Sequence, residues 1–284
     1  MERVKPRWVK SGSVAGRAVL PVLVSFVAFG ATEAWAGSCP SAVDELATDR
    51  PDVTNSSLVV PTGSFQSENG VNLTSRDGGG TIDGTDTRLR LGVAPCLELL
   101  VDLPGYVGNI RAPGASGFTD LSPAVKWQVS PIPGKFDLSI VAGAALPTGA
   151  AEIAGRGTQP YVQLPWSLEL HDGWGVSGML TEFFRPEEIT TRHITETTFV
   201  LEKKLNEKFS VFTEYVGDYP ESAGPAQLIN SGGLYHLSPK EQIDFHIAFG
   251  LNHNSPSYVV GVGYSFRIDG LFGSRAAQQA SRRF

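Results

Sequence analysis

Residues 241–269, EQIDFHIAFGLNHNSPSYVVGVGYSFRID, contain two runs in which apolar and polar side chains alternate, and this alternation decides the fold. The apolar positions of the first run are Ile243, Phe245, Ile247, Phe249 and Leu251. Those of the second run are Tyr258, Val260, Val262, Tyr264, Phe266 and Ile268. A period of two places one kind of side chain on each face of a β-strand. The stretch therefore predicts two successive strands, each with one apolar face and one polar face.

The same alternation recurs toward the N-terminus, for example over residues 88–93, 97–103 and 136–146. Twelve segments can be assigned as strands, and they start near Ser64, Thr85, Cys96, Pro123, Lys135, Thr158, Gly173, His193, Glu207, Ala226, Glu241 and Ser257. The polar faces are rich in glycine, serine and charge. Such faces suit a water-filled or polar-plugged barrel lumen better than the core of a sandwich.

The connections between these segments alternate between tight and long. Tight connections are expected at residues 94–95, 130–134, 171–172, 206 and 238–240. Long connections are expected at residues 75–84, 104–122, 147–157, 186–192, 217–225 and 252–256. Membrane barrels have short periplasmic turns and longer extracellular loops. The sequence therefore predicts an all-β protein, a single antiparallel transmembrane β-barrel of about 12 strands, with 10 or 14 strands as the alternatives.

The first 36 residues have the three-part pattern of a secretory signal peptide. Five cations precede an apolar run that ends at Phe29, and Ala34-Trp35-Ala36 offers small residues to a signal peptidase. We predict cleavage after Ala36; a retained anchor and a lipoprotein modified at Cys39 are the alternatives. The predicted organisation is a signal peptide at residues 1–36, a periplasmic N-terminal segment at 37–63, the barrel at 64–272 and a C-terminal tail at 273–284.

The charge of the mature chain argues against nucleic acid as a partner. Removal of residues 1–36 takes five basic and two acidic residues from totals of 23 and 29, which leaves a net charge of −9. An acidic chain of this kind lacks the basic surface that attracts a phosphate backbone.

Four short motifs carry a family resemblance: TDRPD at residues 48–52, VPTGSFQSENG at 60–70, GFTDL at 117–121 and LPTG at 146–149. With these motifs the chain resembles the outer-membrane family called "putative MetA pathway of phenol degradation", from about residue 48 to 268. The resemblance implies an outer-membrane pore or transporter with a link to aromatic catabolism. It implies no catalytic residues.

The last predicted strand resembles the C-terminal signal that the outer-membrane barrel-assembly machinery reads. Val262, Tyr264 and Phe266 share one face near the end of the chain, although the sequence continues to Phe284. The expected partners are therefore outer-membrane lipid, the barrel-assembly machinery and a small-molecule solute. The expected location is the bacterial outer membrane.

Cys39 and Cys96 are the only two cysteines, and both remain after the predicted cleavage. The topology places Cys39 in the periplasmic segment and Cys96 beside the first periplasmic turn. The oxidising periplasm permits a disulfide between them, which would tie the segment with residues 49–52 to the barrel rim. Two unrelated thiols are the alternative.

Charged residues on the polar faces are the candidates for function, since charge that faces lipid is costly. The lumen-lining candidates are Arg88, Arg90, Glu98, Asp102, Lys126, Asp137, Glu214, Asp244, His246 and Arg267. They are expected either to form a selectivity lining or to pair with one another and fill the lumen. The N-terminal motif Asp49, Arg50, Pro51 and Asp52 is expected either to enter the lumen mouth as a polar plug or to form a local turn.

Motifs for catalysis or metal binding are absent from the sequence. The five histidines are scattered, and no metal-binding spacing, nucleophile elbow or phosphate-binding loop occurs. No cofactor is implied and no enzyme activity is predicted. A barrel lipid hydrolase that pairs His246 with Ser210 or Ser265 is the enzymatic alternative.

The predicted function is passage of small solutes, including aromatic compounds, across the bacterial outer membrane. A non-conducting barrel that acts as a scaffold or adhesin through its external loops is the second hypothesis. A soluble periplasmic β-sandwich that binds a ligand is the third.

Overall fold

The computed structural model describes residue 39 and residues 45–76, 78–110, 114–129, 136–154, 157–186, 191–221 and 223–272. These residues belong to one compact unit, Ala36–Phe284, while the other unit, Met1–Trp35, lies outside the described residues. The predicted signal peptide and the C-terminal tail at residues 273–284 also lie outside them, and both stay predictions.

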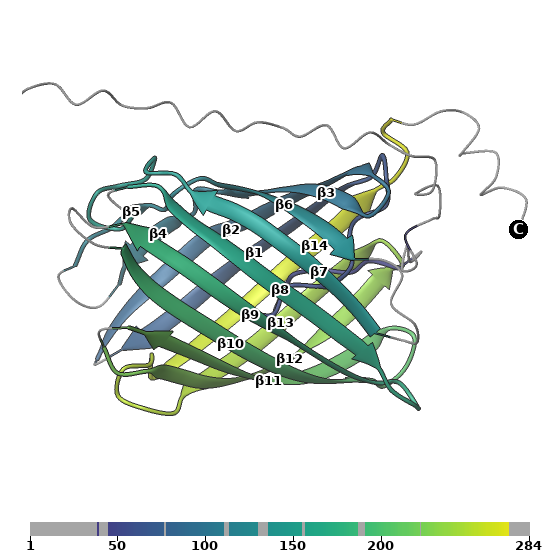
Figure 1. The fold of residues 1–284 in the computed structure, drawn as a ribbon. Coiled ribbons are helices and arrows are strands. Elements are labelled where there is room, and N and C mark those ends of the chain that lie inside the picture. Colours follow the sequence, from purple (N-terminus) through teal and green to yellow (C-terminus); the bar gives the residue numbers. More distant parts are fainter. Residues whose placement is uncertain are drawn as a thin grey trace, which may run out of the picture. The chain divides into compact units, whose positions relative to one another are not determined.

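The described chain forms one large antiparallel sheet that closes on itself (Figure 1). Its strands are β1 (Phe65–Arg76), β2 (Gly79–Ala94), β3 (Leu97–Leu103), β4 (Tyr106–Asn109), β5 (Gly117–Phe118), β6 (Ser122–Val129), β7 (Phe136–Ala145), β8 (Gln159–Glu169), β9 (Trp174–Pro186), β10 (Thr191–Lys204), β11 (Phe209–Pro220), β12 (Ala226–Ser238), β13 (Glu241–Gly250) and β14 (Tyr258–Ile268). The short strand β4 pairs with the first part of β2, the two-residue strand β5 pairs with β4, and the other twelve strands form the barrel wall.

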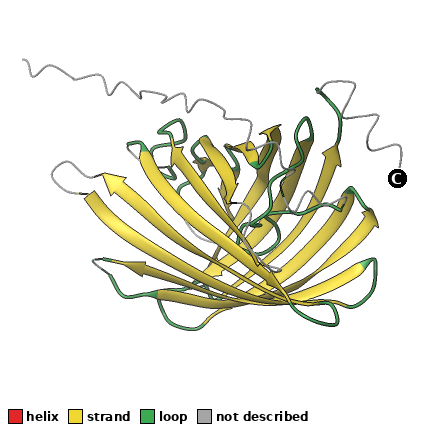
Figure 2. Ribbon diagram, turned by 45° about the vertical axis from the view of Figure 1, so that its right-hand side comes forward, coloured by secondary structure: helices red, strands yellow, loops and turns green. Residues whose placement is uncertain are grey.

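Closure is made by β1, which pairs with β14 on one side and with β2 on the other. The register with β14 runs without a break from Phe65 opposite Ile268 to Ser75 opposite Tyr258. A closed barrel satisfies every strand edge, so only a structure of this kind or a helix can cross a bilayer. The prediction of a twelve-stranded antiparallel barrel is confirmed. Figure 2 shows the strands curving around an interior that contains a loop segment.

The distribution of polarity across the wall is inverted relative to a soluble protein. Fully buried side chains include Arg90, Lys126, Gln66, Gln128, Gln242, Glu68, Glu98 and Glu214. Exposed side chains include Phe199, Phe245, Phe249, Val262, Leu180 and Ile247. Lipid replaces water around the exterior of a membrane barrel, so an apolar outer band and a polar interior are both favourable. This arrangement explains why apolar and polar residues alternate along the strands in the sequence.

The two ends of the barrel differ in their connections. At one end, called here the short-turn end, residues 95–96, 130–135, 170–173, 205–208 and 239–240 join the strands. At the other, the long-loop end, the longest connections are residues 104–121, which contain β4 and β5, and 146–158.

Three connections are shorter than expected. The loop expected at residues 75–84 is wrong, because β1 continues to Arg76 and β2 begins at Gly79, with Ser75 opposite Gly80. The connection expected at residues 186–192 shrinks to 187–190, and the connection expected at 217–225 shrinks to 221–225. Alternation marks only the part of a strand that faces lipid. A strand that extends beyond the apolar band is polar on both faces and has the composition of a loop.

Within the described residues, no helix is long and apolar enough to cross a membrane.

Candidate functional site: a polar plug in the barrel lumen

Residues 45–60, called here the plug, lie inside the barrel and are held by side chains of the surrounding strands. The plug has no regular secondary structure, so its backbone groups need partners from the wall. Strand side chains accept hydrogen bonds from the amides of Asp49, Val53, Thr54, Val59 and Val60. The polar faces of the strands therefore form a receptor for this segment. The described part of the predicted periplasmic segment is thus a lumen element.

Asp49 is the plug residue with the most ion pairs to the wall in the described structure, and it is 5% exposed. Its carboxylate accepts from Arg88 Nη1 at 3.0 Å, Arg90 Nη1 at 3.3 Å and Lys126 Nζ at 3.1 Å. It also accepts from the amide of Ser56 at 2.8 Å, which closes the plug into a loop. Burial raises the pKa of the Asp49 carboxyl, but the three cations outweigh burial and hold the pKa well below its ordinary value.

The cations that bind Asp49 are shared with two glutamates of the wall. Arg90 lies 3.1 Å from Glu68 and 3.0 Å from Glu98, and Lys126 lies 3.3 Å from Glu98. All four of these side chains are fully buried. A buried charge is tolerated when it is paired and hydrogen-bonded, and this cluster places carboxylates beside every buried cation. The wall glutamates Glu68 and Glu98 already balance the charges of Arg90 and Lys126, so Asp49 adds one further negative charge, which contacts these two cations and Arg88.

Arg50 extends from the plug in the opposite direction. It forms ion pairs with Asp86 at 2.9 Å and with Asp244 at 3.5 Å. Asp86 belongs to β2 and Asp244 to β13, so one guanidinium connects two wall positions separated by β1 and β14.

Glu214 of β11 binds the next part of the plug. Its carboxylate accepts the amides of Val53 and Thr54 at 3.0 Å and 2.9 Å, and the Thr54 hydroxyl at 2.8 Å. Asp52 lies nearby without a cation in the described structure that compensates it. Burial raises the pKa of the Asp52 carboxyl well above its ordinary value, and the charge of Glu214 adds to the rise.

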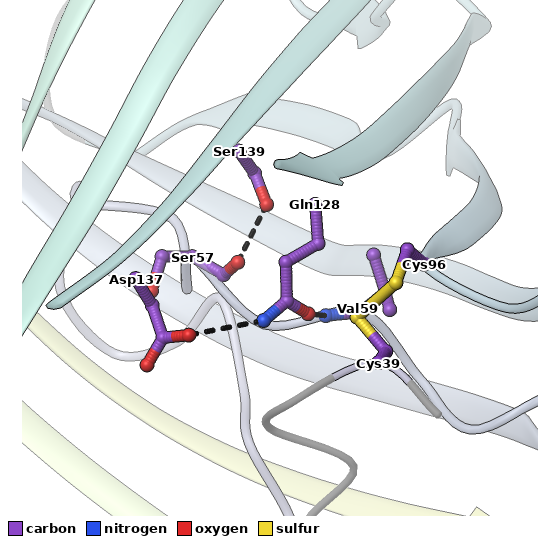
Figure 3. The surroundings of a disulfide bond; sticks show 7 residues. All are labelled: Cys39, Ser57, Val59, Cys96, Gln128, Asp137 and Ser139. Atoms are coloured by element: carbon purple, nitrogen blue, oxygen red, sulfur yellow. Dashed lines mark hydrogen bonds between the residues drawn. A yellow bond between two sulfur atoms is a disulfide. The ribbon is translucent and has the colours of Figure 1, made fainter. Parts of the chain in front are cut away.

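The last part of the plug is fixed near the short-turn end (Figure 3). The Gln128 amide oxygen accepts from the Val59 amide at 3.2 Å, while its Nε2 donates to Asp137 at 3.1 Å. Ser139 donates to the Ser57 carbonyl at 2.5 Å. Beside them, a disulfide joins Cys39 to Cys96, which lies in the connection between β2 and β3. This bond attaches the chain that leads into the plug to the rim of the barrel.

Two cavities border the plug. The larger has a volume of about 700 Å³ and faces the long-loop end, and the smaller has about 330 Å³ and faces the short-turn end. The lining of the larger cavity includes Asp83 of β2 together with Gly105, Thr119 and Ile153 of the long connections. Wall residues of the smaller cavity include Glu169, Gly175, Lys204 and His236. Arg50, Asp52 and Asn55 line both cavities, so these three plug residues stand between them.

The ten lumen-lining candidates do not share one environment. Arg88, Arg90, Glu98, Lys126, Glu214 and Asp244 contact the plug through side chains or its backbone. Arg267 donates to the Glu45 carbonyl at 2.9 Å. Asp102 pairs with Arg88 at 2.6 Å, and Asp137 accepts from Gln128. The structure therefore brings most of the candidates together around one segment.

His246 is held by two amide side chains. Its Nδ1 lies 3.0 Å from Asn230 Oδ1 and its Nε2 lies 3.1 Å from Asn72 Oδ1. The hydrolase alternative needed this ring to contact Ser210 or Ser265, and both ring nitrogens are directed elsewhere. In the described part of the chain, no group of three or more His, Cys, Asp and Glu side chains is placed to hold a metal ion.

Sequence reasoning missed Glu68 and Asp86, which bind the plug from β1 and β2. The first strand has little apolar alternation, since the face opposite Gln66 and Glu68 carries the polar residues Ser67 and Asn69. Position parity from Gln66 would have placed Glu68 in the lumen. Asp86 lies near the start of the second predicted strand, before the alternation at residues 88–93 begins.

The fold and the plug define a class: a closed transmembrane β-barrel of twelve strands with a polar segment of its own chain in the lumen. The family model described as "Putative MetA-pathway of phenol degradation" matches residues 48–268, and the chain belongs to this family. The match begins at the plug and ends with β14. It confirms the resemblance carried by the sequence motifs. No curated protein sequence matches the chain.

Solved structures with the same fold are distant in sequence. The COG4313 outer membrane channel from Pseudomonas putida F1 is 11% identical, with a TM-score of 0.57, over 78% of this chain and 100% of that chain. The NanC porin is 8% identical, with a TM-score of 0.52, over 72% and 100%. The KdgM porin in complex with disordered oligogalacturonate is 8% identical, with a TM-score of 0.51, over 72% and 98%. At these identities the similarity establishes the fold.

Proposed function

We propose that this protein is a channel of the bacterial outer membrane that passes small solutes through a lumen controlled by the plug. The observation that carries the proposal is the pair of cavities on either side of Arg50, Asp52 and Asn55, inside a closed barrel with an apolar exterior. A solute that crosses the lumen must pass these three residues. The similar folds of an outer membrane channel and two porins support the same function and location. The proposal includes no enzymatic step.

The larger cavity favours cations over anions. Its lining contains seven carboxylates against two arginines; the carboxylates are those of Asp49, Asp52, Glu68, Asp83, Asp86, Asp102 and Asp120. A cavity lined mainly by one sign of charge concentrates ions of the opposite sign. We therefore expect cations and neutral solutes to enter more readily than carboxylates or phenolates.

Planar-bilayer recording of the purified, folded protein tests the proposal. We expect discrete conductance steps and, in a potassium chloride gradient, a reversal potential with the sign of cation selectivity. Liposome swelling with phenol, aromatic acids, aromatic amines and sugars identifies the solute class, and the family description makes phenols the first choice. A folded, membrane-inserted protein that never conducts and never supports swelling would refute the channel function.

The plug also supports a second candidate, a non-conducting barrel that acts through its external loops. The observation in its favour is that strand side chains bind the plug at many points and leave no backbone amide among Val53, Thr54, Val59 and Val60 without a partner. Silence in bilayers, together with binding of a surface partner that is lost when the connection at 146–158 is shortened, would favour the scaffold.

A further inference from the structure

Four residues form a row across neighbouring strands on the lumen side of the wall. Asp86 of β2 lies opposite Gly70 of β1, Gly70 lies opposite Gly263 of β14, and Gly263 lies opposite Asp244 of β13. The row therefore has a carboxylate at each end and no side chain in the middle. The guanidinium of Arg50 lies over the two glycines.

The two glycines are required for this arrangement. A Cβ atom at Gly70 would lie 2.2 Å from Cζ of Arg50, and a Cβ atom at Gly263 would lie 2.7 Å from its Nε. Both distances are far shorter than a van der Waals contact, so any side chain at either position would expel the guanidinium. The same Cβ at Gly263 would lie 2.6 Å from Asp244 Oδ2, which shows that this oxygen points over the glycine. Asp86, Gly70, Gly263 and Asp244 are together called here the slot.

Arg50 satisfies only one end of the slot well. Its 2.9 Å bond to Asp86 has the length of a strong charge-assisted hydrogen bond, whereas 3.5 Å to Asp244 is long. Three strand spacings separate the two aspartates, about 14 Å between their backbones, which exceeds what one guanidinium bridges closely. Among the side chains that the structure describes, Asp244 is fully buried and its Oδ2 has no hydrogen-bond partner, nor has Nε of Arg50.

The slot and the Arg50 side chain that lies over it thus combine two carboxylates, one cation, a flat floor and an unsatisfied acceptor. We propose that it is a binding site for a planar cation of a small solute, a guanidinium or amidinium group, which competes with Arg50 for the two aspartates. This inference rests on the proposed channel function and names a solute class for it. A planar cation suits the slot because it lies flat on a glycine floor and donates in two directions, which a compact ammonium cannot do.

Access runs through the larger cavity. The Asp86 side chain is 58% exposed and lines that cavity, as does Arg50, whereas Asp244 is reached only across the two glycines. A solute cation therefore meets Asp86 first and gains Asp244 when Arg50 moves out. Because a ligand shifts an equilibrium by its differential affinity for the two states, such a solute favours the state in which Arg50 has left the slot.

The test uses Arg50→Ala in the full-length protein in detergent, with methylguanidinium as the probe. The variant empties the slot and leaves Asp244 buried without its cation. We expect methylguanidinium at ten times its Kd to raise the midpoint of heat-induced unfolding by roughly 3–6 °C, while tetramethylammonium, which has the same charge but is not planar, leaves it unchanged. In the wild-type protein the apparent affinity for methylguanidinium should be at least tenfold weaker, because Arg50 competes.

Two variants separate the slot from general charge effects. Arg50→Ala combined with Asp244→Asn should lose the response to methylguanidinium. Arg76→Ala removes an arginine that donates to the Asn254 carbonyl outside the slot, and it should show only the weak wild-type response. If Arg50→Ala does not fold, the same titration is made on Arg50→Lys. A rise in the unfolding midpoint with methylguanidinium but not with tetramethylammonium would support the slot, and no rise would overturn it.

An equal response to both cations, or a response that survives Asp244→Asn, would overturn the proposal. Binding in detergent does not depend on conduction. A protein that binds methylguanidinium but never conducts would refute the channel function and support the slot as a binding site. A protein that conducts but does not bind methylguanidinium would refute the slot and support the channel function.

Discussion

Asp49→Asn is expected to release the plug, and the structure sets the size of the effect. The change keeps the shape of the side chain and the acceptor for the Ser56 amide but removes the charge that serves Arg88, Arg90 and Lys126. Loss of one partner from a buried ion pair costs about 3–5 kcal/mol. Because the wall glutamates described above still partner Arg90 and Lys126, we expect the lower end, about 3 kcal/mol.

A loss of about 3 kcal/mol multiplies the population with an undocked plug by roughly 150. In planar bilayers the variant should spend a much larger fraction of time in its highest conductance state. On gels that separate folded from unfolded barrels, the midpoint of heat-induced unfolding should fall by about 6–12 °C. Glu207→Gln, which removes an exposed carboxylate from the connection between β10 and β11, is the matched control and should change neither quantity.

The reasoning fails if Asp49→Asn and Glu207→Gln behave alike in both assays. It also fails if the Asn variant is more stable than the wild-type protein, because repulsion between Asp49 and the wall glutamates would then outweigh its attraction to the three cations.

Three further predictions concern titration, the disulfide and the lipid face. The pKa of Asp52 is raised above its ordinary value, so between these two pKa values the folded state binds more protons than the unfolded state, and the free energy of unfolding falls as pH rises. Asp52→Asn should remove this pH dependence and be more stable than the wild-type protein at neutral pH. The same pH dependence in both proteins would contradict the assignment to Asp52. Cys96→Ser removes a disulfide whose cysteines are 57 residues apart and should lower the free energy of unfolding by about 4 kcal/mol, as should reduction of the wild-type protein. Free thiols at Cys39 and Cys96 in non-reducing mass spectra would exclude the bond. Phe245 is an outward side chain that is 50% exposed, and Phe245→Arg should lower the free energy of unfolding in lipid by about 2–4 kcal/mol. The control Phe245→Leu should lower it little. An arginine variant as stable as the wild-type protein would contradict the lipid-facing assignment.

The barrel wall was predictable because lipid contact imposes a pattern that a linear sequence records. Residues such as Phe245 and Val262 face lipid at every second position, and the strand starts near Ala226 and Glu241 agree with β12 and β13 to the residue. The prediction failed at residues 75–84, where β1 and β2 continue beyond the apolar band and the pattern ends before the strands do.

The sequence by itself determined a closed barrel with an apolar exterior, an inward set of charges and a motif at residues 48–52 of unassigned position. Only the tertiary structure decided how these meet. Whether Arg90 lines an open pore or binds Asp49 depends on which segment occupies the lumen, and the contacts involved span tens to hundreds of residues in the sequence. The slot is the clearest case: Gly70 and Gly263 are ordinary strand glycines until β1 and β14 become neighbours, because barrel closure alone places the first strand beside the last.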